Sequence, residues 1–189
     1  MRRNLTRAGL ALALALAGAV TGVEVGSPAR AVTPAEVAVT PTRGGVASAI
    51  DGPITRAEIV DRAESWVDVP YSPTDLFPDV GNSRVYRRDC AGLVAMAWHL
   101  GSDPWTGTLP TVSTPIRRPD LAPGDILLDA SAHVILFDRW EPDRVHFSYY
   151  SLGPTTARHV THASIDKETL DGRPNSAYQA RRYTRVVTG

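Results

Sequence analysis

The sequence contains few of several residue types on which common folds and functions depend. Its 189 residues include one cysteine, which excludes an intramolecular disulfide framework and a multi-cysteine zinc site. Twenty Lys and Arg residues balance twenty Asp and Glu residues, and this net charge of zero argues against a dedicated nucleic-acid binder. The chain is 43% hydrophobic and 21% charged, which is typical of one globular domain, and its fifteen Gly and fifteen Pro residues indicate that this domain is rich in loops.

Residues 1–31 have the pattern of a secretory signal peptide. Three arginines lie within residues 1–7, an Ala/Leu-rich run follows over residues 8–20, and Ala29-Arg30-Ala31 has the A-x-A form of a cleavage site. The apolar run of about 13 residues is shorter than the roughly 18 to 20 residues of a membrane-spanning helix. We therefore expect cleavage after Ala31, rather than an uncleaved anchor, and a secreted product that is not stably inserted in a membrane.

The remaining chain is predicted to divide into a linker and one folded domain. Residues 32–54 are rich in Ala, Val, Thr, Pro and Gly and have few large apolar side chains, which is typical of a flexible linker. Residues 55–58, with the sequence T-R-A-E, form a capping-box pattern at the start of a helix. The folded domain is therefore expected to span residues 55–189.

Helical patterns come first in this domain and strand patterns follow. An amphipathic helix is expected over residues 56–67, and a second helix over residues 90–100 has almost no polar face, so it should be buried and should end at Gly101. The segment 72–88 is expected to be a loop. Strands are predicted at residues 125–129, 133–140, 144–151 and 179–187, with a turn at 141–143 and no assignment for 154–176. This order predicts an α+β domain.

Cys90 is the strongest candidate for a reactive residue. It lies in the first turn of the buried helix, where free N–H groups and the helix dipole favour a thiolate, the nucleophilic form of cysteine. The alternative is a buried structural cysteine that acts as a small hydrophobic residue. A nucleophilic cysteine needs a base, and His133 at the start of a predicted strand is the candidate, although a lone histidine there is more often structural.

Two motifs together resemble those of the NlpC/P60 superfamily of papain-like cysteine hydrolases. Residues 89–94 read D-C-A-G-L-V, and residues 121–127 read L-A-P-G-D-I-L and are followed by His133-Val134. The family carries D-C-S-G-hydrophobic, then L-x-P-G-D-hydrophobic, then H-V, and it also has a Pro-Tyr pair where Pro70-Tyr71 stands here. The resemblance covers roughly residues 56–187.

The resemblance implies both a fold and an activity. The fold would be α+β, with the cysteine helix packed on an antiparallel sheet of about five or six strands. The activity would be hydrolysis of amide bonds in bacterial cell-wall peptides, usually between γ-D-glutamyl and a diamino acid. Cys90 resembles the nucleophile, His133 the general base, Asp89 a carboxylate that holds a substrate amine, and Tyr71 a tyrosine that assists the oxyanion. No metal or cofactor is implied.

The sequence departs from the family pattern at three places. Ala91 replaces the serine after the nucleophile, residues 72–74 replace a Gly-Gly, and the residue that orients His133 is not obvious. A hairpin about the 141–143 turn would place Tyr150 or Ser151 opposite His133, and strand alternation places His146, Ser148 and Tyr150 on one face. Tyr150 is therefore our predicted third member of the site, followed by Ser148 and His146, although Tyr150 is equally well explained as a packing residue.

Other functions are consistent with the same residues. His159 and His162 form an H-x-x-H pattern, but an offset of three puts them on opposite faces of a strand, so no metal site is predicted. Trp105 is explained by packing or by a place in the floor of a substrate groove. The alternatives to a cell-wall peptidase are a binding module that has kept the fold without turnover, and an amidase or acyl transferase that acts on another amide substrate.

Overall fold

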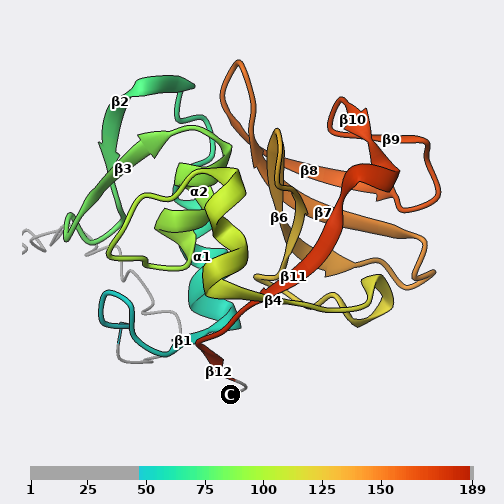
Figure 1. Cartoon of the computed structure of the whole chain (residues 1–189), viewed down its shortest axis with the longest axis horizontal. Helices are drawn as coiled ribbons and strands as arrows, with labels where there is room; N and C mark the ends of the chain where they lie inside the picture. Colours follow the sequence, from blue (N-terminus) through green and yellow to red (C-terminus); the bar gives the residue numbers. More distant parts are fainter. Residues whose placement is uncertain (1–46, 188–189) are drawn as a thin grey trace, which may run out of the picture. The chain divides into compact units, whose positions relative to one another are not determined.

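The computed structural model describes residues 47–187 (Figure 1). The predicted signal peptide and residues 32–46 of the predicted linker lie outside these residues. Within the described part of the chain, no helix is long and apolar enough to cross a membrane.

A six-stranded antiparallel sheet forms the centre of the fold, as the sequence predicted for an α+β domain. Its strand order is β4-β11-β5-β6-β7-β8. The six strands are β4 (Ser113–Pro115), β5 (Ile126–Asp129), β6 (His133–Trp140), β7 (His146–Leu152), β8 (Ala157–Ser164) and β11 (Gln179–Tyr183). β5, β6 and β7 are almost entirely buried, because the sheet is covered on both faces.

Two helices cover one face of the sheet (Figure 1). α1 (Arg56–Glu64) is capped by Thr55, whose side chain accepts a hydrogen bond from the backbone N–H of Glu58. α2 (Cys90–Ala97) is buried at every position after Cys90, as its apolar sequence predicted. The core on this side of the sheet includes Ile59, Trp66, Leu93, Met96, Trp98, Val134, Leu136 and Tyr150.

The end of α2 differs from the sequence prediction. The residue with left-handed backbone is His99, at φ 55°, and not Gly101. The His99 ring is held between two hydroxyls, with Nδ1 3.0 Å from Oγ of Ser48 and Nε2 3.2 Å from Oγ of Ser83. Contacts from distant segments therefore stabilise a backbone conformation for which the sequence alone favours glycine.

Residues 48–54 are packed onto the domain, so the prediction of a flexible linker was wrong for this part of it. Ser48 donates from both its backbone N–H and its hydroxyl to Glu58 of α1. Ile54 is 1% exposed and belongs to β1 (Ile54–Thr55), which pairs with β12 (Val186–Val187). The large apolar side chain at position 54 is what joins this segment to the core.

The segment predicted as a loop at residues 72–88 contains two strands. β2 (Ser72–Pro78) and β3 (Val85–Arg88) form an antiparallel hairpin outside the main sheet. Pro73 and Pro78 argued against a strand, because proline lacks the N–H that a central strand donates. A strand with only one neighbour tolerates that loss, and most of β2 is exposed.

The second face of the sheet is covered by the segment that was left unassigned. β9 (Thr169–Leu170) and β10 (Arg173–Pro174) form a hairpin, and η3 (Asn175–Ala177) follows it. Leu170 from this segment and Tyr178 just after it pack against Ile135, Phe137, Phe147 and Tyr149 of the sheet. The hairpin turn consists of Asp171 and Gly172, at φ 47° and 76°, and it places Asp171 above this face.

The P-G-D part of the second motif has a structural role. Gly124 adopts φ 85°, and a Cβ there would lie 2.9 Å from the Ile59 side chain of α1. Asp125 is fully buried and accepts hydrogen bonds from Arg56 of α1 at 3.0 Å and from Arg182 of β11 at 2.8 Å. This turn therefore connects α1 to the sheet beneath it. The remaining short elements are η1 (Thr106–Val112) and η2 (Arg118–Asp120).

Candidate active site

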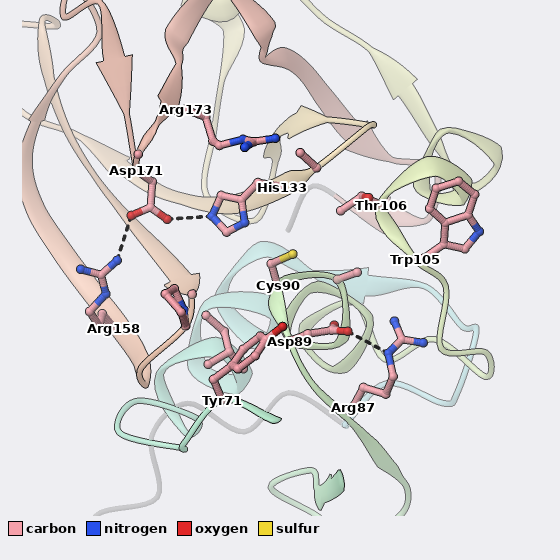
Figure 2. Close-up of a pocket in the computed structure, with 16 residues that line it drawn as sticks. Tyr71, Arg87, Asp89, Cys90, Trp105, Thr106, His133, Arg158, Asp171 and Arg173 are labelled. Carbon is pink, nitrogen blue, oxygen red and sulfur yellow. Dashed lines mark hydrogen bonds and ion pairs between the residues drawn. The ribbon is translucent and has the colours of Figure 1, made fainter. Parts of the chain in front are cut away.

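A cavity of about 650 Å³ contains both residues of the predicted nucleophile–base pair. Cys90 enters it from the start of α2, and His133 enters it from the start of β6. Figure 2 shows the sulfur of Cys90 on the side of the imidazole ring that faces away from Asp171. Two residues that are far apart in sequence thus line one cavity, which the motif resemblance had implied.

The backbone around Cys90 is held by two close contacts. Asp89 caps α2, and its Oδ1 accepts a hydrogen bond from the backbone N–H of Gly92 at 2.7 Å. A Cβ on Gly92 would lie 1.9 Å from the backbone oxygen of Arg87, so only glycine lets α2 begin this close to β3. Cys90 is half-buried at the first helical position, where the backbone N–H has no partner within the helix.

His133 is oriented by a carboxylate. Its Nε2 lies 2.7 Å from Oδ2 of Asp171, which leaves Nδ1 as the ring nitrogen available to the cysteine. Burial lowers the pKa of His133, but the hydrogen bond to Asp171 and the interaction with Cys90 outweigh burial and raise the pKa to about 9. The imidazolium form is therefore favoured at neutral pH, next to the thiol.

Asp171 is itself held by four donors. Oδ2 accepts from His133 and from the hydroxyl of Ser151, and Oδ1 accepts from the hydroxyl of Tyr149 at 3.2 Å and from Arg158 at 2.9 Å. Burial raises the pKa of Asp171, but the hydrogen bonds from His133 and Ser151 outweigh it and lower the pKa to about 2. The carboxylate is thus ionised and fixed in place, as a residue that orients a histidine must be.

Tyr150 does not occupy the position predicted for it. Its hydroxyl donates to Oε2 of Glu64 at 2.8 Å, and its ring stacks on His159, with centroids 4.4 Å apart. Tyr150 pairs with Leu136 and packs with Val134 among the residues that face the helices, whereas His133 alternates onto the other face. The residue at hydrogen-bonding distance from Nε2 of His133 is Asp171.

The error came from the register of the β6–β7 hairpin. The expected turn at 141–143 would pair Trp140 with Arg144, but Trp140 pairs with Phe147, and the bulge at Asp138 then reduces this three-residue shift to two. The connection is longer because Arg144 adopts φ 59° and the backbone N–H of Glu141 bonds to the oxygen of His146. The other two candidates also lie elsewhere, since Ser148 donates to Asp138 and His146 bonds to Asp143.

One sequence signal pointed toward Asp171. Asp-Gly is the strongest short signal for a two-residue hairpin turn, and residues 171–172 lie between two short strands in the segment left unassigned. That signal locates a turn, but it does not show which side chain the turn approaches. Ser151, which the predicted register placed opposite His133, does contact this site, with Oγ 3.4 Å from Nε2.

Tyr71 and Asp89, the two predicted substrate-binding residues, both line the cavity. Tyr71 is 39% exposed, and its backbone N–H is anchored to the oxygen of Thr155. Asp89 has little hydrogen-bonding capacity left for a substrate amine, because its Oδ2 already accepts from Nε of Arg87 at 2.8 Å. Trp105 also lines the cavity and is 59% exposed, so it lies in the wall of a groove as well as packing over Gly107.

The two histidines of the H-x-x-H pattern contact different partners. His159 lies 3.0 Å from Asp138, while His162 lies 2.9 Å from Glu141 and stacks on His146, with ring centroids 4.0 Å apart. Among the described residues, Glu141, His146 and His162 are a group whose ligand atoms are close enough to surround a metal ion. None of the three lines the cavity that contains Cys90.

Comparison with solved structures gives a likeness to a peptidoglycan hydrolase, whereas the comparisons of sequence give no match. No protein-family model matches the sequence, and no curated protein matches it. The peptidoglycan hydrolase RipB from Mycobacterium tuberculosis aligns with a TM-score of 0.43 and 19% sequence identity. The alignment covers 67% of this chain and 63% of the RipB chain, which is less than two thirds of RipB.

Proposed function

We propose that this protein is a secreted cysteine hydrolase that cleaves amide bonds in bacterial cell-wall peptides. The observation that carries the proposal is the alignment of Cys90, His133 and Asp171 in one cavity, with Asp171 2.7 Å from the ring nitrogen that faces away from the sulfur. The type of substrate comes from the NlpC/P60 resemblance of residues 89–94 and 121–134. Export rests on the signal-peptide pattern of residues 1–31.

The reaction would proceed through a thioester. The Cys90 thiolate attacks the carbonyl carbon of the amide, and the His133 imidazolium gives its proton to the leaving amine as the C–N bond breaks. His133, now neutral, removes a proton from water, which attacks the thioester and releases the carboxylic acid and the thiolate. Asp171 keeps the ring in the required tautomer and stabilises the imidazolium form.

Two donors are positioned to stabilise the oxyanion of the tetrahedral intermediate. The backbone N–H of Cys90 is the first of α2, and helix N-termini favour negative charge. The hydroxyl of Tyr71 belongs to a side chain that reaches the same cavity from the segment before β2. Neither donor requires a metal or cofactor for this role.

The proposal is tested with purified cell wall and muropeptides, with the products identified by mass spectrometry. The wild-type protein is expected to release peptides with new amino termini, and Cys90→Ala is expected to abolish this release. Tyr150→Phe is the matched control, because Tyr150 belongs to β7 of the same sheet but bonds to Glu64 and does not line the cavity. If no cysteine-dependent cleavage occurs across a broad panel of wall peptides, the proposed function is wrong.

The same experiment distinguishes the alternative of a binding module. A site without a residue to orient His133 would favour a binding module, but Asp171 lies at hydrogen-bonding distance from His133. Ala91 is the remaining departure. A binding module would retain wall peptides without cleaving them, and its thiol would react with iodoacetamide no faster than a free thiol, whether or not His133 is replaced by alanine.

A further inference from the structure

The charges that line the cavity are not balanced. The lining includes three arginines, Arg87, Arg158 and Arg173, and two aspartates, Asp89 and Asp171. Arg87 bonds to Asp89 at 2.8 Å, and Arg158 bonds to Asp171 at 2.9 Å. Both carboxylates are thus paired with an arginine, and Arg173 is the lining cation that is left over.

Arg173 has unused hydrogen-bonding capacity. Its contact with Asp129 is an ion pair at 3.6 Å, beyond hydrogen-bonding distance, and its side chain is 42% exposed. Its Nε is buried and has no hydrogen-bond partner. Buried polar atoms are normally satisfied, and among the described residues this is the orphaned atom whose residue lines the cavity. Figure 2 shows the guanidinium beside the His133 ring, at the edge of the open space.

In the part of the chain that the structure describes, the cavity has no free carboxylate or serine hydroxyl at the position where the motif resemblance implies that a substrate amine is held. Asp89 uses one oxygen to cap Gly92 and the other to bind Arg87. Ala91 supplies a methyl group where the motif resemblance implies a serine hydroxyl, and it is 2% exposed. An ammonium group in this cavity would therefore meet a carboxylate that is already paired with Arg87, together with the positive charge of Arg173.

We propose that Arg173 binds a carboxylate of the substrate, on the leaving-amine side of the bond that is cut. This rests on the proposed function, in which His133 delivers a proton to the leaving amine, so a group beside His133 contacts that part of the substrate. A guanidinium presents a planar fork of N–H donors that matches a carboxylate. Arg173 follows the Asp171-Gly172 turn directly, so one hairpin places both the residue that orients His133 and the residue that selects the substrate.

The charge preference can be measured without turnover, because Cys90 is the only thiol in the chain. The reagents are two methanethiosulfonates, one with an anionic sulfonate and one with a cationic trimethylammonium group. The ratio of their rates with Cys90 is expected to favour the anion relative to a free cysteine derivative. Arg173→Ala should reduce this ratio about thirtyfold at low salt, because one charge a few ångströms away in a water-like medium changes each rate about fivefold, in opposite directions for the two reagents.

Two further variants complete this measurement. Arg117→Ala is the matched control, because Arg117 is an exposed arginine that pairs with Asp120 and does not line the cavity. It should leave the ratio unchanged. Arg173→Lys keeps the charge and should keep most of the ratio, so it separates an electrostatic effect from a loss of folding. An unchanged ratio in Arg173→Ala, with a wild-type melting temperature, would overturn the proposal.

Cleavage then tests the position of the carboxylate. Peptide pairs that differ only in a carboxylate or a carboxamide on the leaving-amine side are compared by kcat/KM. The wild-type protein should prefer the carboxylate at least tenfold, through KM, and Arg173→Ala should abolish this preference, whereas Arg117→Ala should keep it. Cleavage of both peptides without preference would overturn the inference and leave the proposed function standing. If the thiol is charge-selective but no peptide is cleaved, the proposed function is overturned and the charge preference of the cavity stands.

Discussion

Oδ2 of Asp171 lies 2.7 Å from Nε2 of His133, although the two residues are 38 positions apart in the sequence. Their contact joins the turn of a small hairpin to the first residue of a central strand. It determines which ring nitrogen faces Cys90, and it raises the pKa of His133 toward 9. The predictions below follow from this contact and from the packing around it.

Asp171→Asn should lower kcat/KM for wall-peptide cleavage by about a hundredfold or more, because an amide neither stabilises an imidazolium nor selects the required tautomer. The variant should also change the pH profile. In the wild type, His133 loses its proton near pH 9, so the alkaline limb should lie there. In Asp171→Asn the limb should move toward neutral pH. A limb that stays near pH 9 would show that Asp171 does not control His133.

The same contact should make stability depend on pH. The pKa of His133 is raised from 6.5 to about 9, so its contribution is complete below pH 6.5 and is lost as the pH rises through 9. The pKa of Asp171 is lowered from 3.8 to about 2, so its contribution is present above pH 3.8 and is lost toward pH 2. Denaturation by urea should therefore show the largest difference between wild type and Asp171→Asn at pH 4 to 6.5, and a smaller one at pH 9.5.

Tyr150→Phe and Ser151→Ala should affect different properties, stability in the first and activity in the second, although the residues are adjacent. Tyr150→Phe removes the hydrogen bond to Glu64 and should cost about 1 kcal/mol of folding free energy, with kcat/KM within twofold of wild type. Ser151→Ala removes a donor to Asp171 and should lower kcat/KM several-fold. Kinetics and melting temperatures of both variants test this; a large loss of activity in Tyr150→Phe would restore the role first predicted for Tyr150.

Gly92→Ala should destabilise the fold by about 3 kcal/mol or more, because a Cβ 1.9 Å from the Arg87 oxygen forces α2 away from β3. This movement would also displace Asp89 and Cys90, so activity should fall as well. Gly81→Ala is the matched control, since a Cβ there meets no atom within 4 Å. Denaturation midpoints should fall for the first variant and stay near wild type for the second.

Asp125→Asn tests whether the P-G-D turn is structural. The change leaves Arg56 and Arg182 without their shared carboxylate and should cost about 3 kcal/mol of folding free energy. Activity per folded molecule should stay near wild type at low temperature, because Asp125 does not line the cavity. Asp120→Asn, which breaks an exposed pair with Arg117, should leave the midpoint unchanged. Equal effects of both changes on the midpoint would contradict this role.

The sequence by itself determined the α+β class, the two helices and most strands of the sheet, and its resemblance to known motifs pointed to Cys90 and His133 as a pair. These depend on local information: apolar periodicity, helix caps, and short motifs in which neighbouring residues act together. α2 is buried because nearly all its residues are apolar, and no distant contact was needed to predict that. The close approach at Gly92 and the left-handed backbone of Gly124 also belong to their motifs.

Only the tertiary structure decided which residue orients His133 and how the cavity is charged. The longer turn shifted β7 by three residues relative to β6 at Trp140, and the bulge reduced this shift to two, so Tyr150 pairs with Leu136, whose side chain faces the helices. Tyr150 therefore lies on the helix side, while Asp171 and Arg173 reach the site from a hairpin about forty residues beyond His133. Such placements depend on how distant segments pack, which no local pattern of residues specifies.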